Sequence, residues 1–136
     1  MDTHNPKFVY VEDDLMSQEV VRVLLQNVLG FPSLTVFTNS TNLLERLDRL
    51  SEKPDVFFLD VQIGPHDGFE MLNMLRNNPS YQAATIVAMT ANVMAHDIEA
   101  LRKAGFDGLI GKPIRKKVFP SLVQNLIAGE AVWYVP

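Results

Sequence analysis

Five short apolar runs alternate with helical patterns along this chain, and this alternation constrains the fold more than any other feature. Each run is rich in β-branched, aromatic or aliphatic residues and is bounded by polar or turn residues, as is typical of buried strands in a parallel sheet. The predicted strands are Phe8–Val11, Leu34–Phe37, Val56–Leu59, Thr85–Met89 and Phe106–Gly111. Parallel neighbours need long crossover connections, which are usually helices. The pattern therefore predicts a doubly wound α/β fold, in which helices cover both faces of a five-stranded parallel sheet.

Apolar residues at helical spacing follow every predicted strand, and glycine, asparagine or proline ends most of these segments. The helical patterns begin near Met16, Leu43, Phe69, Met94 and Val118. No repeat or internal linker interrupts them. We therefore expect one domain over residues 7–128, with an N-terminal arm at residues 1–6 and a C-terminal tail at residues 129–136, in which Trp133 and Tyr134 lie.

The composition excludes several classes of protein. Hydrophobic residues make up 47% of the chain and charged residues 21%, which is normal for a globular domain and argues against disorder. The net charge of −4 offers no surface for direct nucleic-acid binding. The absence of cysteine excludes disulfides, thiolate catalysis and Cys-based metal sites. No apolar run approaches the roughly 18 residues that cross a bilayer, and no secretory signal precedes the first strand, so we expect a soluble cytoplasmic protein.

Acidic residues stand where two of the predicted strands end. Glu12 and Asp13 follow the first strand, and Asp60 ends the third. The carboxyl ends of the strands are where ligands bind in an open α/β sheet. Mg²⁺ takes oxygen ligands and retains several waters, so Asp13 and Asp60 are candidate direct ligands and Glu12 would act through water. Taken alone, the run of three acids has a simpler explanation, because acidic residues are common at helix starts.

A lysine and a threonine extend this cluster into a site for a phosphoryl group. Asp60 is a competent nucleophile toward phosphorus, and the ammonium group of Lys112 would neutralise charge on a phosphoryl oxygen. Thr90 ends the fourth strand, and its hydroxyl and the backbone N–H of Ala91 are candidate donors to the same group. Each residue also has an ordinary role open to it, such as a turn cap or a surface lysine. Chance placement of all of them at strand ends is the weaker explanation.

In these motifs the chain resembles the receiver domains of response regulators, and in particular the single-domain chemotaxis and phosphorelay regulators. The matching segments are Val11–Asp14, Leu59–Gly68, Thr90–Ala91, Gly105–Asp107 and Lys112–Ile114, in the order and spacing of that family. The resemblance covers essentially the whole predicted domain. It implies a flavodoxin-like (βα)5 fold with the strand order 2-1-3-4-5.

The resemblance also implies roles for the clustered residues. Asp60 would be the phosphoacceptor. The metal ion, Mg²⁺ or Mn²⁺, would be bound by Asp13, Asp60 and the backbone carbonyl of Gln62, with Glu12 in the outer shell.

The remaining residues would act on the phosphoryl group. Thr90 and the N–H of Ala91 would sense it, and Lys112 would contact it. The Lys112–Pro113 peptide bond is expected to be cis, as it commonly is in such domains. The chain departs from the family at two places. Ile63 and Gly64 stand where Met-Pro often follows the acceptor strand, and Leu109 stands three positions before the lysine, where an aromatic residue usually lies.

The function that the resemblance implies is signalling. A sensor histidine kinase or a histidine phosphotransfer protein would donate the phosphoryl group, and a downstream protein would read the resulting change of conformation. The domain would assist its own phosphorylation and dephosphorylation without being an enzyme in the usual sense. We expect a monomer or weak dimer that binds neither a membrane nor nucleic acid directly.

The sequence bears on three alternatives to this function. The chain is either a stand-alone regulator or a receiver fragment of a larger regulator or hybrid kinase. An aspartate-based phosphohydrolase usually carries a second acid two residues after its nucleophile, where this chain has Gln62. A flavodoxin-like binder of small ligands would need a phosphate-cradling loop after the first strand, whereas Glu12, Asp13 and Asp14 would repel a phosphate.

Overall fold

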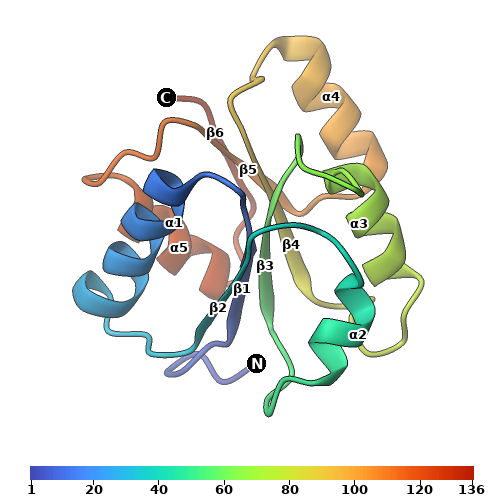
Figure 1. Ribbon diagram of the computed structural model, residues 1–136. Coiled ribbons are helices and arrows are strands. Elements are labelled where there is room, and N and C mark those ends of the chain that lie inside the picture. Colours follow the sequence, from blue (N-terminus) through green and yellow to red (C-terminus); the bar gives the residue numbers. More distant parts are fainter.

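The computed structural model describes all residues from Met1 to Pro136 and consists of one parallel sheet flanked by helices (Figure 1). The strands are β1 (Phe8–Val11), β2 (Leu34–Phe37), β3 (Val56–Asp60), β4 (Thr85–Thr90), β5 (Gly108–Gly111) and β6 (Val132–Tyr134). The helices are α1 (Leu15–Arg22), the π-helical η1 (Val23–Val28), α2 (Leu43–Asp48), α3 (Gly68–Arg76), α4 (Ala95–Ala104) and α5 (Phe119–Ile127). Every predicted strand and helix is present, which confirms the predicted alternation of strands and helices.

The sheet has the strand order β2-β1-β3-β4-β5-β6, and all its pairings are parallel. The first five strands follow the expected order 2-1-3-4-5. The expected number of strands was wrong by one, because Val132–Tyr134 in the predicted tail forms a sixth strand beside β5. A three-residue strand carries too little local pattern to be recognised by its periodicity. Its formation depends on the neighbouring strand, which is contributed from more than twenty residues earlier in the chain.

Two hydrophobic cores separate the sheet from its helices. One core lies between the sheet and α2, α3 and α4, and includes Val9, Phe57, Met71 and Leu109. The other lies between the sheet and α1, η1 and α5, and includes Tyr10, Phe58, Val87 and Phe119. The two groups of helices lie on opposite sides of the sheet in Figure 1. Because successive side chains of a strand point to opposite faces, neighbouring residues of β1 and β3 enter different cores.

Three helix ends have identifiable caps. The carboxylate of Asp14 accepts a hydrogen bond from the backbone N–H of Ser17 and starts α1. Asp67 and Glu70 form a reciprocal capping box at the start of α3. Gly105 ends α4 with a φ of 108°, a left-handed conformation that favours glycine. The caps at Asp14 and Asp67 fix where the connections that follow β1 and β3 end.

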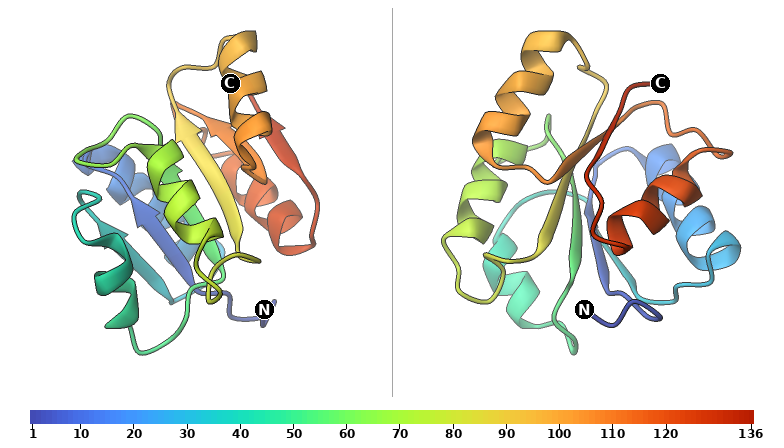
Figure 2. Two further views of the ribbon diagram at one scale, coloured as in Figure 1. Left: turned by 90° about the vertical axis from the view of Figure 1, so that its right-hand side faces the viewer. Right: turned by 180° about the vertical axis from the view of Figure 1, so that it is seen from behind.

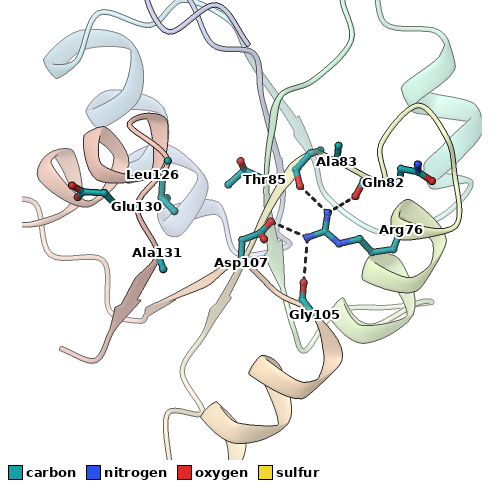
Figure 3. A pocket seen from close by; sticks show the side chains of 11 residues that line it. Arg76, Gln82, Ala83, Thr85, Gly105, Asp107, Leu126, Glu130 and Ala131 are labelled. Carbon is teal, nitrogen blue, oxygen red and sulfur yellow. Dashed lines mark hydrogen bonds and ion pairs between the residues drawn. The ribbon is translucent and has the colours of Figure 1, made fainter.

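The largest cavity, about 500 Å³, lies at the opposite end of the sheet from these connections (Figure 3). Arg76 at the end of α3 forms one wall. Its guanidinium donates to the carbonyls of Gln82, Ala84 and Gly105 and to the carboxylate of Asp107, at 2.8–3.2 Å. Asp107 in turn accepts from the backbone N–H of Ile86. Because these polar groups satisfy one another, the arrangement ties the end of α3 to the α3–β4 and α4–β5 connections.

We expect Arg76→Met to lower the free energy of unfolding by about 2 kcal/mol, because three carbonyls and one carboxylate lose their donor while the aliphatic packing is retained. Urea denaturation monitored by circular dichroism measures the change. Arg115→Met, at an exposed arginine of the β5–α5 connection, serves as the matched control and is expected to be neutral. Equal stability of the two variants would show that the Arg76 hydrogen bonds contribute nothing to the stability of the fold.

Candidate functional site

The carboxyl ends of β1, β3, β4 and β5 meet at one edge of the sheet and bring the predicted polar residues together. Glu12 and Asp13 follow β1, and Asp60 ends β3. One carboxylate oxygen from each of these three residues lies within 4.8 Å of the others. Glu12 is fully buried and Asp60 nearly so, whereas Asp13 is exposed. The structure therefore assembles an acidic cluster with one open side.

Glu12 is held by donors from several elements. Its Oε1 accepts from the hydroxyl of Tyr10 at 2.9 Å and from the ammonium of Lys112, and its Oε2 accepts from the backbone N–H of Asp14 at 3.2 Å. Burial alone would raise the pKa of Glu12, but hydrogen bonds from Lys112 and the neighbouring groups outweigh it and lower the pKa. Glu12 is therefore a buried carboxylate that stays ionised.

Tyr10 is a site residue that the sequence analysis did not identify. Its ring lies in the core beneath the cluster and its hydroxyl points to Glu12. Burial first, and then the charge of Glu12, raise the pKa of the Tyr10 hydroxyl far above its usual range, so Tyr10 remains a donor. A signal was available, because residues two apart on a strand share a face, and Tyr10 precedes Glu12 by two positions.

Asp60 faces the same lysine at a longer distance. Lys112 Nζ lies 3.6 Å from Asp60 Oδ2, and the backbone N–H of Gln62 donates to Asp60 Oδ1 at 3.2 Å. Burial and the neighbouring Glu12 carboxylate raise the pKa of Asp60 to about 7, although Lys112 acts in the opposite direction. One ammonium group thus stands between two buried carboxyl groups and is closer to Glu12.

Thr90 and Lys112 are joined through the backbone where β4 and β5 end. Thr90 is buried, its carbonyl accepts from the N–H of Lys112 at 2.9 Å, and its Oγ1 accepts from the N–H of Asn92 at 3.1 Å. Ala91 directly follows and is exposed at the start of the connection to α4. The Lys112–Pro113 bond is cis, as the resemblance implied.

The connection after Asp60 is fixed from the side by Ser40, another residue that the sequence analysis did not identify. Ser40 Oγ donates to the carbonyl of His66 at 2.6 Å and accepts from the N–H of His66 at 2.7 Å. The N–H of Ser40 also donates to the carbonyl of Gly64 at 3.1 Å. Serine in a connection carries no pattern that indicates so distant a partner. These bonds position the connection in which Gln62 lies.

The comparisons with known proteins agree with this geometry. A family model described as the response regulator receiver domain matches residues 8–124. The polar-differentiation response regulator DivK of Brucella ovis is 30% identical over 122 residues, which are 89% of this chain and 94% of that protein. This chain belongs to the family of response regulator receiver domains, which are modules of two-component signalling.

A second relative shows the domain in a different setting. The osmosensing histidine protein kinase SLN1 of Saccharomyces cerevisiae is 26% identical over 126 residues, which are 90% of this chain but 10% of the kinase. The chain thus spans a tenth of this relative and nearly all of DivK.

Solved structures confirm the fold. The non-phosphorylated receiver domain of the stress response regulator RcsB from Escherichia coli matches with a TM-score of 0.82 and 17% identity, over 96% of this chain and 99% of that one. The chemotaxis response regulator CheY4 of Vibrio cholerae matches with a TM-score of 0.79 and 20% identity, over 90% of this chain and 98% of that one. None of the helices of this chain is both long enough and apolar enough to span a membrane.

Proposed function

We propose that this receiver domain accepts a phosphoryl group on Asp60 from a partner's phosphohistidine and signals by a change of conformation. The observation that carries the proposal is the position of Lys112, whose ammonium reaches both Glu12 and Asp60 at the open edge of the sheet. A carboxylate oxygen of Asp60 attacks phosphorus and forms an acyl phosphate while the bond from phosphorus to the histidine nitrogen breaks. The nitrogen keeps the electron pair. Lys112 faces the charge that develops on the phosphoryl oxygens.

The donor set fits a hard divalent cation. When ionised, Glu12, Asp13 and Asp60 carry three negative charges, against the single positive charge of Lys112. Burial, together with the neighbouring Glu12 carboxylate, raises the pKa of Asp60, so Asp60 tends to hold a proton when no cation is present. We propose that Asp13, Asp60 and the Gln62 backbone carbonyl bind Mg²⁺ or Mn²⁺, with Glu12 in the outer shell. The bound ion supplies charge neutralisation for the phosphoryl oxygens.

Thr90 and Ala91 complete the proposed site. The Thr90 hydroxyl lies at the end of β4, next to the strand that carries Asp60, because Asp60 pairs with Met89. We propose that this hydroxyl and the N–H of Ala91 donate to phosphoryl oxygens on Asp60. Such bonds exist only in the phosphorylated state, so they favour a different position of the connection after β4.

The experiment that tests the function is labelling with acetyl phosphate and Mg²⁺, followed by intact mass and peptide mapping. The wild type is expected to gain one phosphoryl group on Asp60, and the transfer releases acetate. Asp60→Asn is expected to gain none, and chelation of the divalent cation is expected to prevent labelling of the wild type. Equal labelling of the wild type and Asp60→Asn, with the adduct mapped to another residue, would overturn the assignment.

Substitution of two adjacent aspartates tests which of them binds the metal ion. We expect Asp13→Ala to weaken Mg²⁺ binding about tenfold or more, because second-sphere changes alone reach that size. Asp14→Ala is expected to have a much smaller effect, because the Asp14 carboxylate is engaged by Ser17 at the start of α1. Isothermal titration calorimetry measures both. If Asp14→Ala weakens binding more than Asp13→Ala, the proposed ligand set is wrong.

A protein donor is proposed because exposed apolar residues stand at the starts of two helices next to the site. Leu15 and Met16 of α1 and Met94 at the start of α4 are 65–77% exposed. A histidine that reaches Asp60 must bring its protein surface over these residues, which suits a histidine kinase or histidine phosphotransfer protein. A downstream protein would read the changed surface. A cytoplasmic location and a monomeric or weakly dimeric state, without direct binding of nucleic acid or membrane, complete the proposal.

A further inference from the structure

Residues 131–136, called the C-terminal strap below, run along the outer edge of β5. The registered pairs are Gly108 with Val132, Leu109 with Trp133 and Ile110 with Tyr134. Figure 2 shows this last segment beside β5, with the chain end at the edge of the sheet where the candidate site lies. A Cβ atom on Gly108 would lie 2.5 Å from the carbonyl oxygen of Val132, and its nearest atoms all belong to the Val132 backbone. Glycine at this position therefore permits the close approach of the strap.

The strap meets the connection that follows Thr90 at a second glycine. A Cβ atom on Gly111 would lie 2.6 Å from Pro136 Cδ, 2.9 Å from Val93 Cγ1 and 3.2 Å from the carbonyl oxygen of Tyr134. The end of the strap and the β4–α4 connection thus converge on one residue. Gly111 directly precedes Lys112 in the chain. The strap therefore reaches the edge of the candidate site.

The strap also contacts α4, the helix that this connection leads into. The guanidinium of Arg102 lies 4.3 Å from the centre of the Trp133 ring, within the range of a cation–π contact. Trp133 is half-buried and packs against the core that contains Leu101 and Leu109. Of the two segments that follow Thr90, α4 therefore contacts the strap directly, and the connection meets it at Gly111.

We propose that the C-terminal strap is a latch controlled by the phosphoacceptor site: it is seated when Asp60 is free and loosens when Asp60 is phosphorylated. This inference rests on the proposed function. For the Thr90 hydroxyl and the Ala91 N–H to donate to a phosphoryl group on Asp60, the connection must move toward Asp60. Val93 then withdraws from Gly111, and the packing of Pro136 at the same residue is loosened.

The strap is bound weakly, so looser packing at its end can release it. Its strand has three residues and stands at the edge of the sheet with its outer side unpaired. Apart from the buried Val132, the strap is half-buried or exposed. Because coupling between two binding events is reciprocal, unseating the strap must also favour the phosphoryl-bound state.

The strap carries its own reporter, since Trp133 is the only tryptophan in the chain. We expect labelling of the wild type with acetyl phosphate and Mg²⁺ to shift its emission to longer wavelength. Hydrogen exchange at the amides of Trp133 and Tyr134 is expected to accelerate at least about fivefold. Asp60→Asn in the same solution is expected to show neither change.

The reciprocal half of the test uses a variant of the β5 residue against which the strap packs. Gly108→Ala places a methyl group against the Val132 backbone and should displace the strap even when no phosphoryl donor is present. We expect it to bind beryllium fluoride, a phosphoryl mimic, at least about fivefold more tightly than the wild type in excess Mg²⁺, as measured by calorimetry. Val135→Ala, at an exposed strap residue, is the matched control and is expected to bind like the wild type. Deletion of residues 131–136 provides a second variant and should also bind more tightly.

The outcomes separate the inference from the function. A wild type that is fully labelled on Asp60, with unchanged emission and exchange at the strap, would overturn the latch and leave the phosphoacceptor intact. Unchanged beryllium fluoride affinity in both Gly108→Ala and the deletion would do the same. Absence of labelling at Asp60 would overturn the proposed function itself, and the latch with it.

Discussion

Lys112→Met is expected to slow the phosphorylation of Asp60 by about a hundredfold or more, which is the usual cost of removing one charge-stabilising donor from a reacting oxyanion. Lys112 is the one basic side chain that pairs with Asp60, at 3.6 Å, and with Glu12. Methionine keeps the aliphatic length of lysine but supplies no charge to the transferring phosphoryl group. The backbone bond from Lys112 to Thr90 is retained, so the ends of β4 and β5 should stay in register.

The rate is measured as the labelled fraction against time in acetyl phosphate and Mg²⁺, by intact mass. Lys116→Met is the matched control, because Lys116 is an exposed lysine in the same connection between β5 and α5. We expect it to be labelled at the rate of the wild type. Labelling of Lys112→Met within a few-fold of the wild type would show that this ammonium group does not stabilise the transfer.

Asp60→Asn is expected to raise the free energy of unfolding of the metal-free protein, relative to the wild type, by about 2–4 kcal/mol more at pH 8 than at pH 4. The pKa of Asp60 is about 7 in the folded protein, against an ordinary value of 3.8. The folded state therefore binds the proton more tightly than the unfolded state. Each tenfold difference in proton affinity corresponds to about 1.4 kcal/mol. This contribution to stability is fully present below pH 4 and is lost as the pH rises to about 7.

Asparagine does not titrate, so the variant avoids this loss while its side-chain oxygen can still accept from the N–H of Gln62. Urea denaturation at a series of pH values, with a chelator present, gives the difference in unfolding free energy. Asp48→Asn, at an exposed carboxylate of α2, is the matched control for the change of charge. A difference between Asp60→Asn and the wild type that stays constant from pH 4 to pH 8 would contradict the assigned pKa.

Much of the candidate site could be predicted from the sequence because of one topological rule. In a parallel sheet all strands end at the same edge, so residues that follow strands must meet there. Glu12, Asp13, Asp60 and Lys112 were predicted on this basis, and the structure brings them together. The ends of the strands could be predicted because each is marked by a local change from apolar to polar residues.

The pairings within the site could not be predicted in the same way. Lys112 is a hundred residues from Glu12, and its closer approach to Glu12 than to Asp60 depends on the packing of β5 against β4. Ser40 binds the connection after Asp60 across a separation of 26 residues. A hydrogen bond between a loop serine and a distant backbone leaves no periodic trace in a sequence.

The sequence by itself determined the parallel α/β fold, the order of its elements and the edge at which the acidic residues gather. These follow from the local alternation of strand and helix patterns and from the rule for parallel strands. Only the tertiary structure decided the sixth strand, the contact of Trp133 with Arg102 and the convergence of Val93 and Pro136 on Gly111. These features join segments that are distant in the chain, and they depend on the sheet edge that β5 provides for the C-terminal strap.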